Sequence, residues 1–155
     1  MDVRIAEVKI AKKGEILKCI LGSCVGIAFI WKQKKICGLA HCLLPLNPDP
    51  SFEIGARFVD QAFKSLIALM RIRPEDYSQV DVVIVGGGNM TNPEEQDDKK
   101  MIGYHNYSAA LNEAKKYSFK VLFSEGGGEE GRKIFVDSTS LTYRVEKIPR
   151  IIKAS

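Results

Sequence analysis

The sequence predicts a mixed α/β (α+β) fold in which helices pack on a largely antiparallel sheet. Strand-like segments outnumber helical ones, and the two kinds follow each other in mixed order along the chain. The segment Val80–Val85 is apolar enough for a central strand that is buried on both faces. With 155 residues, 45% hydrophobic and 27% charged, the chain is long enough to bury a core as one domain, residues 1–155.

Extended segments account for most of the first 45 residues. The polar tip Lys32-Gln33-Lys34-Lys35 separates two strongly apolar segments and predicts a hairpin. Pro45 ends the second of them, because proline cannot continue a ladder. The predicted strands are Val3–Ile10, Glu15–Leu21, Cys24–Trp31 and Ile36–Leu44.

Two later segments have the apolar spacing of helices. Ser51 can cap a helix that runs to about Arg71, and a second helix is predicted over Tyr107–Tyr117. The remaining predicted elements are the strands Val80–Val85 and Lys120–Phe123, a hairpin of Lys133–Val136 with Leu141–Val145, and an exposed loop at Thr91–Lys100.

Composition argues against two classes of partner. The net charge is only +4 and no Lys/Arg block is present, so binding to nucleic acid is not expected. The apolar segment Gly22–Ile30 is too short to cross a membrane, and Met1–Arg4 lacks the apolar stretch of a signal peptide. We therefore expect a cytoplasmic, monomeric protein with no membrane insertion.

The four cysteines lie within 24 residues of one another. Disulfides are not expected, because the cytoplasm keeps thiols reduced. A zinc site is the less favoured alternative, because an offset of five residues on a strand sends Cys19 and Cys24, and likewise Cys37 and Cys42, to opposite faces. We expect no metal site, and interpret Cys19, Cys37 and Cys42 as small buried hydrophobic residues.

Cys24 and His41 form the candidate catalytic pair. If Lys32-Gln33 is the hairpin turn, Cys24 lies directly opposite His41; if the turn is Gln33-Lys34, the two are diagonal neighbours. A histidine beside a thiol can accept its proton, and backbone N–H groups at Gly22-Ser23 can cradle an oxyanion. The alternative is a buried cysteine beside a hydrogen-bonded core histidine.

The triple-glycine runs Gly86–Gly88 and Gly126–Gly128 follow predicted strands. A phosphate-binding loop leads directly into a helix and usually carries a lysine, whereas Gly86–Gly88 runs into Asn89-Met90-Thr91. We interpret the glycines as sites of close backbone approach.

The hairpin carries segments that resemble those of a known family. Leu21-Gly22-Ser23-Cys24-Val25-Gly26 and Gly38-Leu39-Ala40-His41-Cys42-Leu43-Leu44-Pro45 are similar to the signature segments L-G-S-C-V and A-H-x-x-L-P of the CheD chemoreceptor glutamine deamidases. The family separates its Cys and His by seventeen residues, as Cys24 and His41 are separated here. The similarity extends through Val85–Gly88, Ile102-Gly103 with Asn106, and Gly127-Gly128 with Arg132.

The resemblance implies a layered α/β sandwich similar to that of bacterial toxin deamidases. It implies a protein-glutamine glutaminase that converts glutamines of methyl-accepting chemotaxis receptors to glutamate, and that can also hydrolyse glutamate methyl esters there. Cys24 would be the nucleophile and His41 the general base and then the general acid, with no metal or organic cofactor. Some members of the family bind the chemotaxis phosphatase CheC.

One residue departs from the family's pattern. The family usually has a threonine six residues before the cysteine, thought to orient the histidine, and here that position is Lys18. A lysine has no acceptor for an imidazole N–H, so a backbone carbonyl would have to orient His41, or activity would be weakened. Lys18 therefore keeps open the alternative of a catalytically weakened module that binds CheC or receptors. A thiol hydrolase that acts on a small amide is a further alternative, because it would share the Cys24–His41 pair but would require a deep closed pocket.

Overall fold

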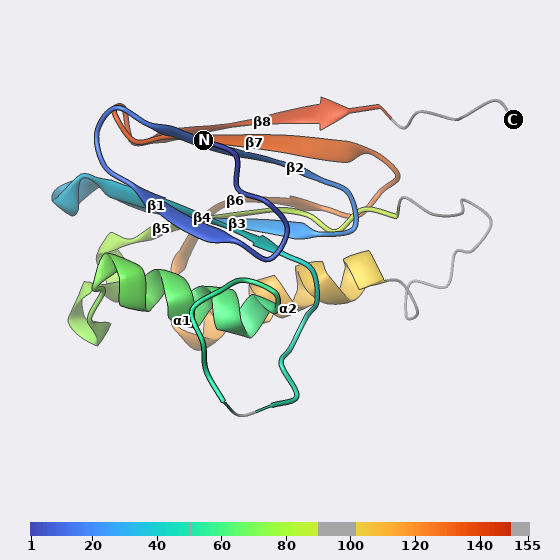
Figure 1. Cartoon of the computed structure of the whole chain (residues 1–155), viewed down its shortest axis with the longest axis horizontal. Helices are drawn as coiled ribbons and strands as arrows, with labels where there is room; N and C mark the ends of the chain where they lie inside the picture. The colour runs from blue at the N-terminus through green and yellow to red at the C-terminus, as the bar shows by residue number, and fades with distance from the viewer. Residues whose placement is uncertain (50, 90–101, 150–155) are drawn as a thin grey trace, which may run out of the picture.

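The computed structural model describes residues 1–49, 51–89 and 102–149, which form three layers (Figure 1). A five-stranded sheet is the middle layer, with a three-stranded sheet on one face and two helices on the other. Only the pairing of β5 with β6 is parallel among the strand pairs described. The predicted mixed α/β class is confirmed, although the residue pattern did not separate the strands into two sheets.

The middle sheet has the order β1-β4-β3-β5-β6. Every residue of β3 and β4 is buried, because one face of these strands meets the helices and the other meets the second sheet. This explains why their sequences are almost continuously apolar rather than alternating. The strands are β1 (Val8–Ala11), β3 (Val25–Trp31), β4 (Ile36–Cys42), β5 (Asp81–Gly86) and β6 (Lys120–Gly126).

The second sheet consists of β2 (Ile16–Leu21), β7 (Gly131–Asp137) and β8 (Thr142–Ile148), in the order β2-β7-β8. Its inward residues alternate with exposed ones, as expected for a sheet with one face in solvent. The C-terminal hairpin that the sequence predicted is therefore present as β7 and β8.

The helices are α1 (Val59–Met70) and α2 (Ile102–Lys116), and two short 3-10 helices are η1 (Lys32–Lys34) and η2 (Pro74–Gln79). Neither α1 nor α2 is both long and apolar enough to cross a membrane. Their apolar faces pack on the middle sheet, where Phe29, Phe63 and Phe119 form edge and tilted ring contacts.

The predicted first strand, Val3–Ile10, is wrong in its first half. β1 begins only at Val8, because the residues before it connect two other strands. The N–H of Val3 donates to the carbonyl of Lys18 on β2, and the N–H of Ala6 donates to the carbonyl of His41 on β4.

The predicted first helix is also wrong at its start, since α1 begins at Val59 and not after Ser51. The backbone before Val59 pairs with other loops: the N–H groups of Leu43 and Leu44 donate to Arg57, and that of Ala56 donates to Ala6. The second helix starts at Ile102, five residues earlier than predicted. The predicted loop Thr91–Lys100 lies outside the described residues.

All four cysteines are buried and free of disulfides. Cys37 faces the second sheet and Cys42 faces the helices, as the offset of five residues predicts. Cys19 and Cys24 share one layer, contrary to that prediction, because Gly22-Ser23 interrupts the strand between them. Among the described residues, no group of three His, Cys, Asp or Glu side chains is placed to hold a metal ion.

Candidate active site

Cys24 and His41 lie at the same end of the β3–β4 hairpin. Gly26 pairs with His41 and Val25 pairs with Cys42, so the hairpin adopts the second of the two predicted registers. Cys24, one residue before β3, is therefore a diagonal neighbour of His41 and not its direct partner. The residue directly opposite His41 is Gly26, which puts no side chain beside the imidazole on that strand.

Both side chains are buried between the two sheets. Cys24 is 6% exposed and belongs to the apolar layer that includes Leu21 and Val85, and His41 is 5% exposed. The two residues share this face because side chains two apart on a strand, and those directly opposite each other, point the same way.

A main-chain carbonyl orients His41. The Nδ1 atom of His41 lies 3.0 Å from the carbonyl oxygen of Val3, which can only accept a hydrogen bond. Nδ1 must therefore carry the proton, and in the neutral imidazole the unprotonated nitrogen is Nε2. The atom that can accept a thiol proton is thus selected by a residue of the N-terminal segment.

Burial favours the uncharged form of both side chains. Burial lowers the pKa of His41, partly offset by the Val3 hydrogen bond, and burial raises the pKa of the Cys24 thiol. No hydrogen bond joins these two described side chains. Near neutral pH we therefore expect a protonated thiol and a neutral imidazole, not a preformed thiolate–imidazolium pair.

Glycines hold the backbone on both sides of Cys24. The N–H of Gly88 donates to the carbonyl of Gly22, and the N–H of Gly87 donates to the carbonyl of Cys24, each at 2.9 Å. Gly86 and Gly87 have φ values of 116° and 68°, which side-chain-bearing residues rarely adopt. The interpretation of Gly86–Gly88 as a site of close backbone approach is confirmed.

The carbonyl of Ser23, which lies between those of Gly22 and Cys24, accepts a hydrogen bond from a side chain. The Nδ2 group of Asn106, on α2, donates to the carbonyl of Ser23 at 3.0 Å and to that of Leu43 at 2.9 Å. Three successive carbonyls, from Gly22 to Cys24, are thus fixed. The N–H groups of Ser23 and Cys24 find no acceptor among the described residues.

The side chain of Lys18 lies away from His41. Lys18 alternates with the inward residues Leu17 and Cys19 on β2, is 40% exposed at its side chain, and lies 3.9 Å from a carboxylate oxygen of Asp2. Its backbone acts instead, because its carbonyl accepts from the N–H of Val3. Position 18 thus supports His41 through the main chain, by way of Val3.

A part-buried ion pair lies beside the Cys24 loop. Arg132 is 4% exposed and pairs in register with Leu21, the residue before Gly22. Its Nε donates to a carboxylate oxygen of Glu125 at 3.0 Å. This ion pair joins β7 to β6 at the end of the molecule where Cys24 and His41 lie.

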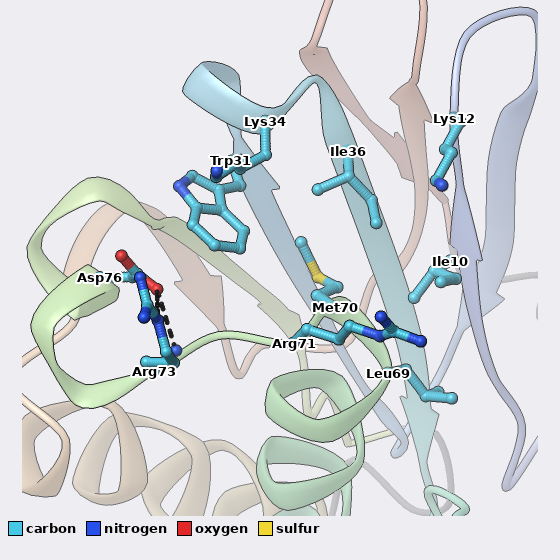
Figure 2. Close-up of a pocket in the computed structure, with 10 residues that line it drawn as sticks. All are labelled: Ile10, Lys12, Trp31, Lys34, Ile36, Leu69, Met70, Arg71, Arg73 and Asp76. Carbon is cyan, nitrogen blue, oxygen red and sulfur yellow. Dashed lines mark hydrogen bonds and ion pairs between the residues drawn. The ribbon is translucent and has the colours of Figure 1, made fainter.

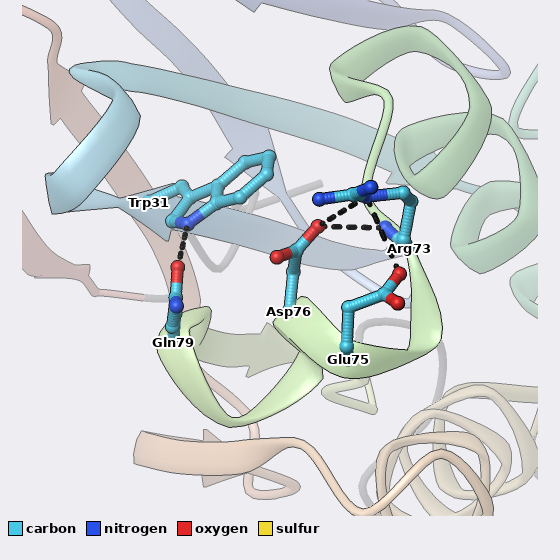
Figure 3. A network of polar contacts seen from close by, with 5 residues as sticks. All are labelled: Trp31, Arg73, Glu75, Asp76 and Gln79. Atoms are coloured by element: carbon cyan, nitrogen blue, oxygen red, sulfur yellow. Dashed lines mark hydrogen bonds and ion pairs between the residues drawn. The ribbon is translucent and has the colours of Figure 1, made fainter.

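A hollow of about 660 Å³ lies at the other end of the hairpin, and the residues that line it are drawn in Figure 2. None of its lining residues is a cysteine, histidine or serine, so the hollow has no side chains of the kinds found in the pair of Cys24 and His41. Next to it, the indole N–H of Trp31 donates to Gln79 at 3.0 Å, and Arg73 pairs with Glu75 and Asp76 (Figure 3).

Sequence reasoning identified Cys24, His41, Gly22 and Ser23, and the structure brings all four to one end of the hairpin. It did not assign a role to Val3 or Asn106. Val3 acts through its carbonyl, which every residue type has, so no sequence signal could reveal it. Asn106 appeared only as part of the family resemblance, because its partners are main-chain groups far away in sequence.

Comparisons with known proteins identify the family of this chain. Residues 43–147 match the family described as CheD, chemotactic sensory transduction. A probable chemoreceptor glutamine deamidase CheD of Bdellovibrio bacteriovorus is 35% identical over 96% of this chain and 94% of its own length. A protein with the corresponding description from a Ruegeria species is 35% identical over 97% and 93%. One from the archaeon Thermococcus kodakarensis is 31% identical over 96% and 92%.

Proposed function

The chain belongs to the CheD family, and from this premise we propose that it is a chemoreceptor glutamine deamidase, a protein-glutamine glutaminase. Its substrates are glutamine side chains of methyl-accepting chemotaxis receptors, which it hydrolyses to glutamate. The observation that carries the proposal is the buried pair of Cys24 and His41, in which the Val3 carbonyl leaves Nε2 free to accept a proton.

The first half of the reaction forms a thioester. His41 Nε2 takes the proton from Cys24 Sγ as sulfur attacks the carbonyl carbon of the glutamine carboxamide. The negative oxygen of the tetrahedral intermediate accepts hydrogen bonds from the N–H groups of Ser23 and Cys24. Imidazolium then protonates the nitrogen, the C–N bond breaks and ammonia leaves.

The second half regenerates the enzyme. His41 takes a proton from water, the resulting hydroxide adds to the thioester carbonyl, and the C–S bond breaks as the proton returns to sulfur. The products are glutamate and the free thiol of Cys24. No metal or organic cofactor takes part in these steps, because the proton and both bonds are accounted for by the dyad and water.

The same steps apply to a glutamate methyl ester, with methanol as the leaving group in place of ammonia. Receptor methylesterase activity is therefore part of the proposal, as are a cytoplasmic location and a CheC-type phosphatase as a second partner. The alternative, a weakened binding module, rested on Lys18. It is not favoured, because the carbonyl of Val3 supplies the orienting acceptor that the Lys18 side chain lacks.

The experiment is intact-mass analysis of a purified receptor cytoplasmic fragment after incubation with the protein. Each deamidation replaces NH₂ by OH and adds about one mass unit, which peptide mapping then locates. Cys24→Ala should remove the mass shift. Cys37→Ala is the matched control, because Cys37 is a buried cysteine on the same face at the far end of β4. A shift that persists with Cys24→Ala, or none with the unaltered protein, would overturn the proposal.

A further inference from the structure

Asn106 joins the two strand ends that carry the dyad. It projects from α2, and its single Nδ2 group donates to the carbonyl of Ser23, which precedes Cys24, and to that of Leu43, two residues after His41. These carbonyls lie just outside the ends of two different strands, β3 and β4, so one side chain links the loop of Cys24 to the end of the His41 strand.

The hydrogen-bond network fixes which way the amide points. Both contacts are to carbonyl oxygens, which accept only, so the NH₂ group must face them. The other end of the side chain, Oδ1, is buried without a partner, and Asn106 as a whole is 0% exposed. Burying the unpaired Oδ1 atom costs free energy, so the two hydrogen bonds that Nδ2 donates must offset that cost.

Close packing allows α2 to reach these carbonyls. Gly103, three residues before Asn106, faces Gly87, and a Cβ on either glycine would overlap the other's backbone. The helix therefore approaches the strand ends more closely than side chains would permit. The same glycine loop that holds the Cys24 carbonyl also admits the helix that holds the Ser23 carbonyl.

We propose that Asn106 is a positioning residue of the deamidase, which fixes the loop that carries Cys24 relative to the end of the strand that carries His41. The inference rests on the proposed function, but its first readout, the reactivity of Cys24, needs no receptor. Among the described residues, Asn106 donates hydrogen bonds only to main-chain carbonyls, so it acts on both catalytic residues through the main chain.

The test is a series of three variants that are similar in size. In Asn106→Asp, a buried carboxyl that faces two carbonyl oxygens stays protonated and can donate one hydrogen bond, so one of the two hydrogen bonds of Asn106 is kept. In Asn106→Leu neither bond survives. Glu113→Gln is the matched control: Glu113 is a buried polar residue two turns along the same helix, away from the strand ends.

The first measurement is the rate of Cys24 alkylation by iodoacetamide against pH, followed by mass mapping of the Cys24 peptide. The second is kcat and KM on the receptor fragment, well below the melting temperature of each variant. We expect kcat to fall in the order unaltered protein, Asn106→Asp, Asn106→Leu, by at least about tenfold for leucine, with KM within twofold. The pH dependence of the Cys24 alkylation rate should change in the same order of variants. Glu113→Gln should change neither kcat nor this pH dependence.

A purely structural role gives a different result: Asn106→Leu would melt at lower temperature, yet its folded fraction would keep its kcat and alkylation profile. That outcome would overturn the inference. If the unaltered protein does not deamidate the receptor but alkylation still follows the series, the proposed function fails and the positioning role of Asn106 stands.

Discussion

The two ends of the β3–β4 hairpin are held by different kinds of contact. At the dyad end, the acceptors are main-chain carbonyls: Val3 for the His41 ring, and Ser23 and Leu43 for Asn106. At the far end the contacts join side chains, as between Trp31 and Gln79 (Figure 3). The hydrogen bonds of His41 and Asn106 are therefore accepted by the main chain, whereas side chains make the contacts between Trp31 and Gln79 and between Arg73 and Glu75.

The difference fits the role that we propose for Cys24 and His41. A proton transfer needs groups fixed to within fractions of an ångström, and main-chain carbonyls move less than long side chains do. The far end has only to close the hairpin. Its Arg73 and Glu75 side chains are 73% and 65% exposed, and ion pairs at such exposure contribute little to stability. Substitutions should therefore affect activity at one end and stability at the other.

The largest effect is expected at His41. His41→Gln keeps a polar side chain of similar size but removes the base, so kcat should fall by about a thousandfold, within the range measured for general bases. Receptor deamidation followed by intact mass measures it. A loss of tenfold or less would mean that Cys24 reacts without His41 as its base.

The directions of the pKa shifts of Cys24 and His41 make a prediction about pH. Burial raises the Cys24 pKa above its ordinary 9.0, so the thiolate fraction should grow about tenfold per pH unit from 7 to 9. Burial lowers the His41 pKa below its ordinary 6.5, so the acid limb of kcat/KM should lie below that value. Iodoacetamide alkylation of Cys24 measures the first. A rate that is already at its plateau at pH 6 would instead indicate a preformed ion pair.

The carbonyl of Val3 can be removed by deleting the first four residues, so that the initiating methionine takes the place of Arg4 and no carbonyl remains at position 3. The deletion takes away the acceptor for His41 Nδ1–H, so the imidazole can adopt the wrong tautomer, and we expect kcat to fall about tenfold. Asp2→Ala is the control, because the Asp2 side chain is 75% exposed and its ion pair with Lys18 is long. Equal kcat in the deletion and in the control would show that another group orients the ring.

The far end should respond in stability alone. Asp76 accepts hydrogen bonds from the N–H of Arg73 at 3.1 Å and from its Nε, and so caps η2. Asp76→Ala should reduce the free energy of unfolding by about 1–2 kcal/mol, as expected for a lost cap, and leave kcat within twofold. Urea unfolding measures the first quantity and receptor deamidation the second. A large loss of kcat would mean that the two ends of the hairpin are coupled.

The sequence predicted best what the hairpin itself determines. Apolar runs on both sides of Lys32–Lys35 were enough to pair β3 with β4 and to bring Cys24 near His41. The register needed the structure, because η1 and Lys35, with φ of 54°, make a loop longer than the two-residue turns considered. One residue of register decides between a direct and a diagonal pair.

Contacts between segments distant in sequence could not be predicted. The segment Ala56–Phe58 has helical spacing in sequence, but its backbone pairs with Ala6 and Leu44, and tertiary hydrogen bonds overrode the local pattern. The same holds for Val3, whose carbonyl reaches His41 across 38 positions in the chain. A residue that acts through its backbone can be of any type, so its identity in the sequence does not reveal that role.

Lys18 gives the smallest predicted effect and the sharpest contrast between backbone and side chain. Lys18→Thr introduces the residue that the family usually has there, and a side-chain role for that position would raise activity. Here the side chain at 18 points to solvent beside Asp2, while the carbonyl at 18 holds Val3 whatever the residue type. We therefore expect kcat/KM on the receptor fragment to stay within twofold of the unaltered protein. A rise of tenfold would mean that threonine at this position reaches His41, and that the Val3 carbonyl is a weaker substitute for it.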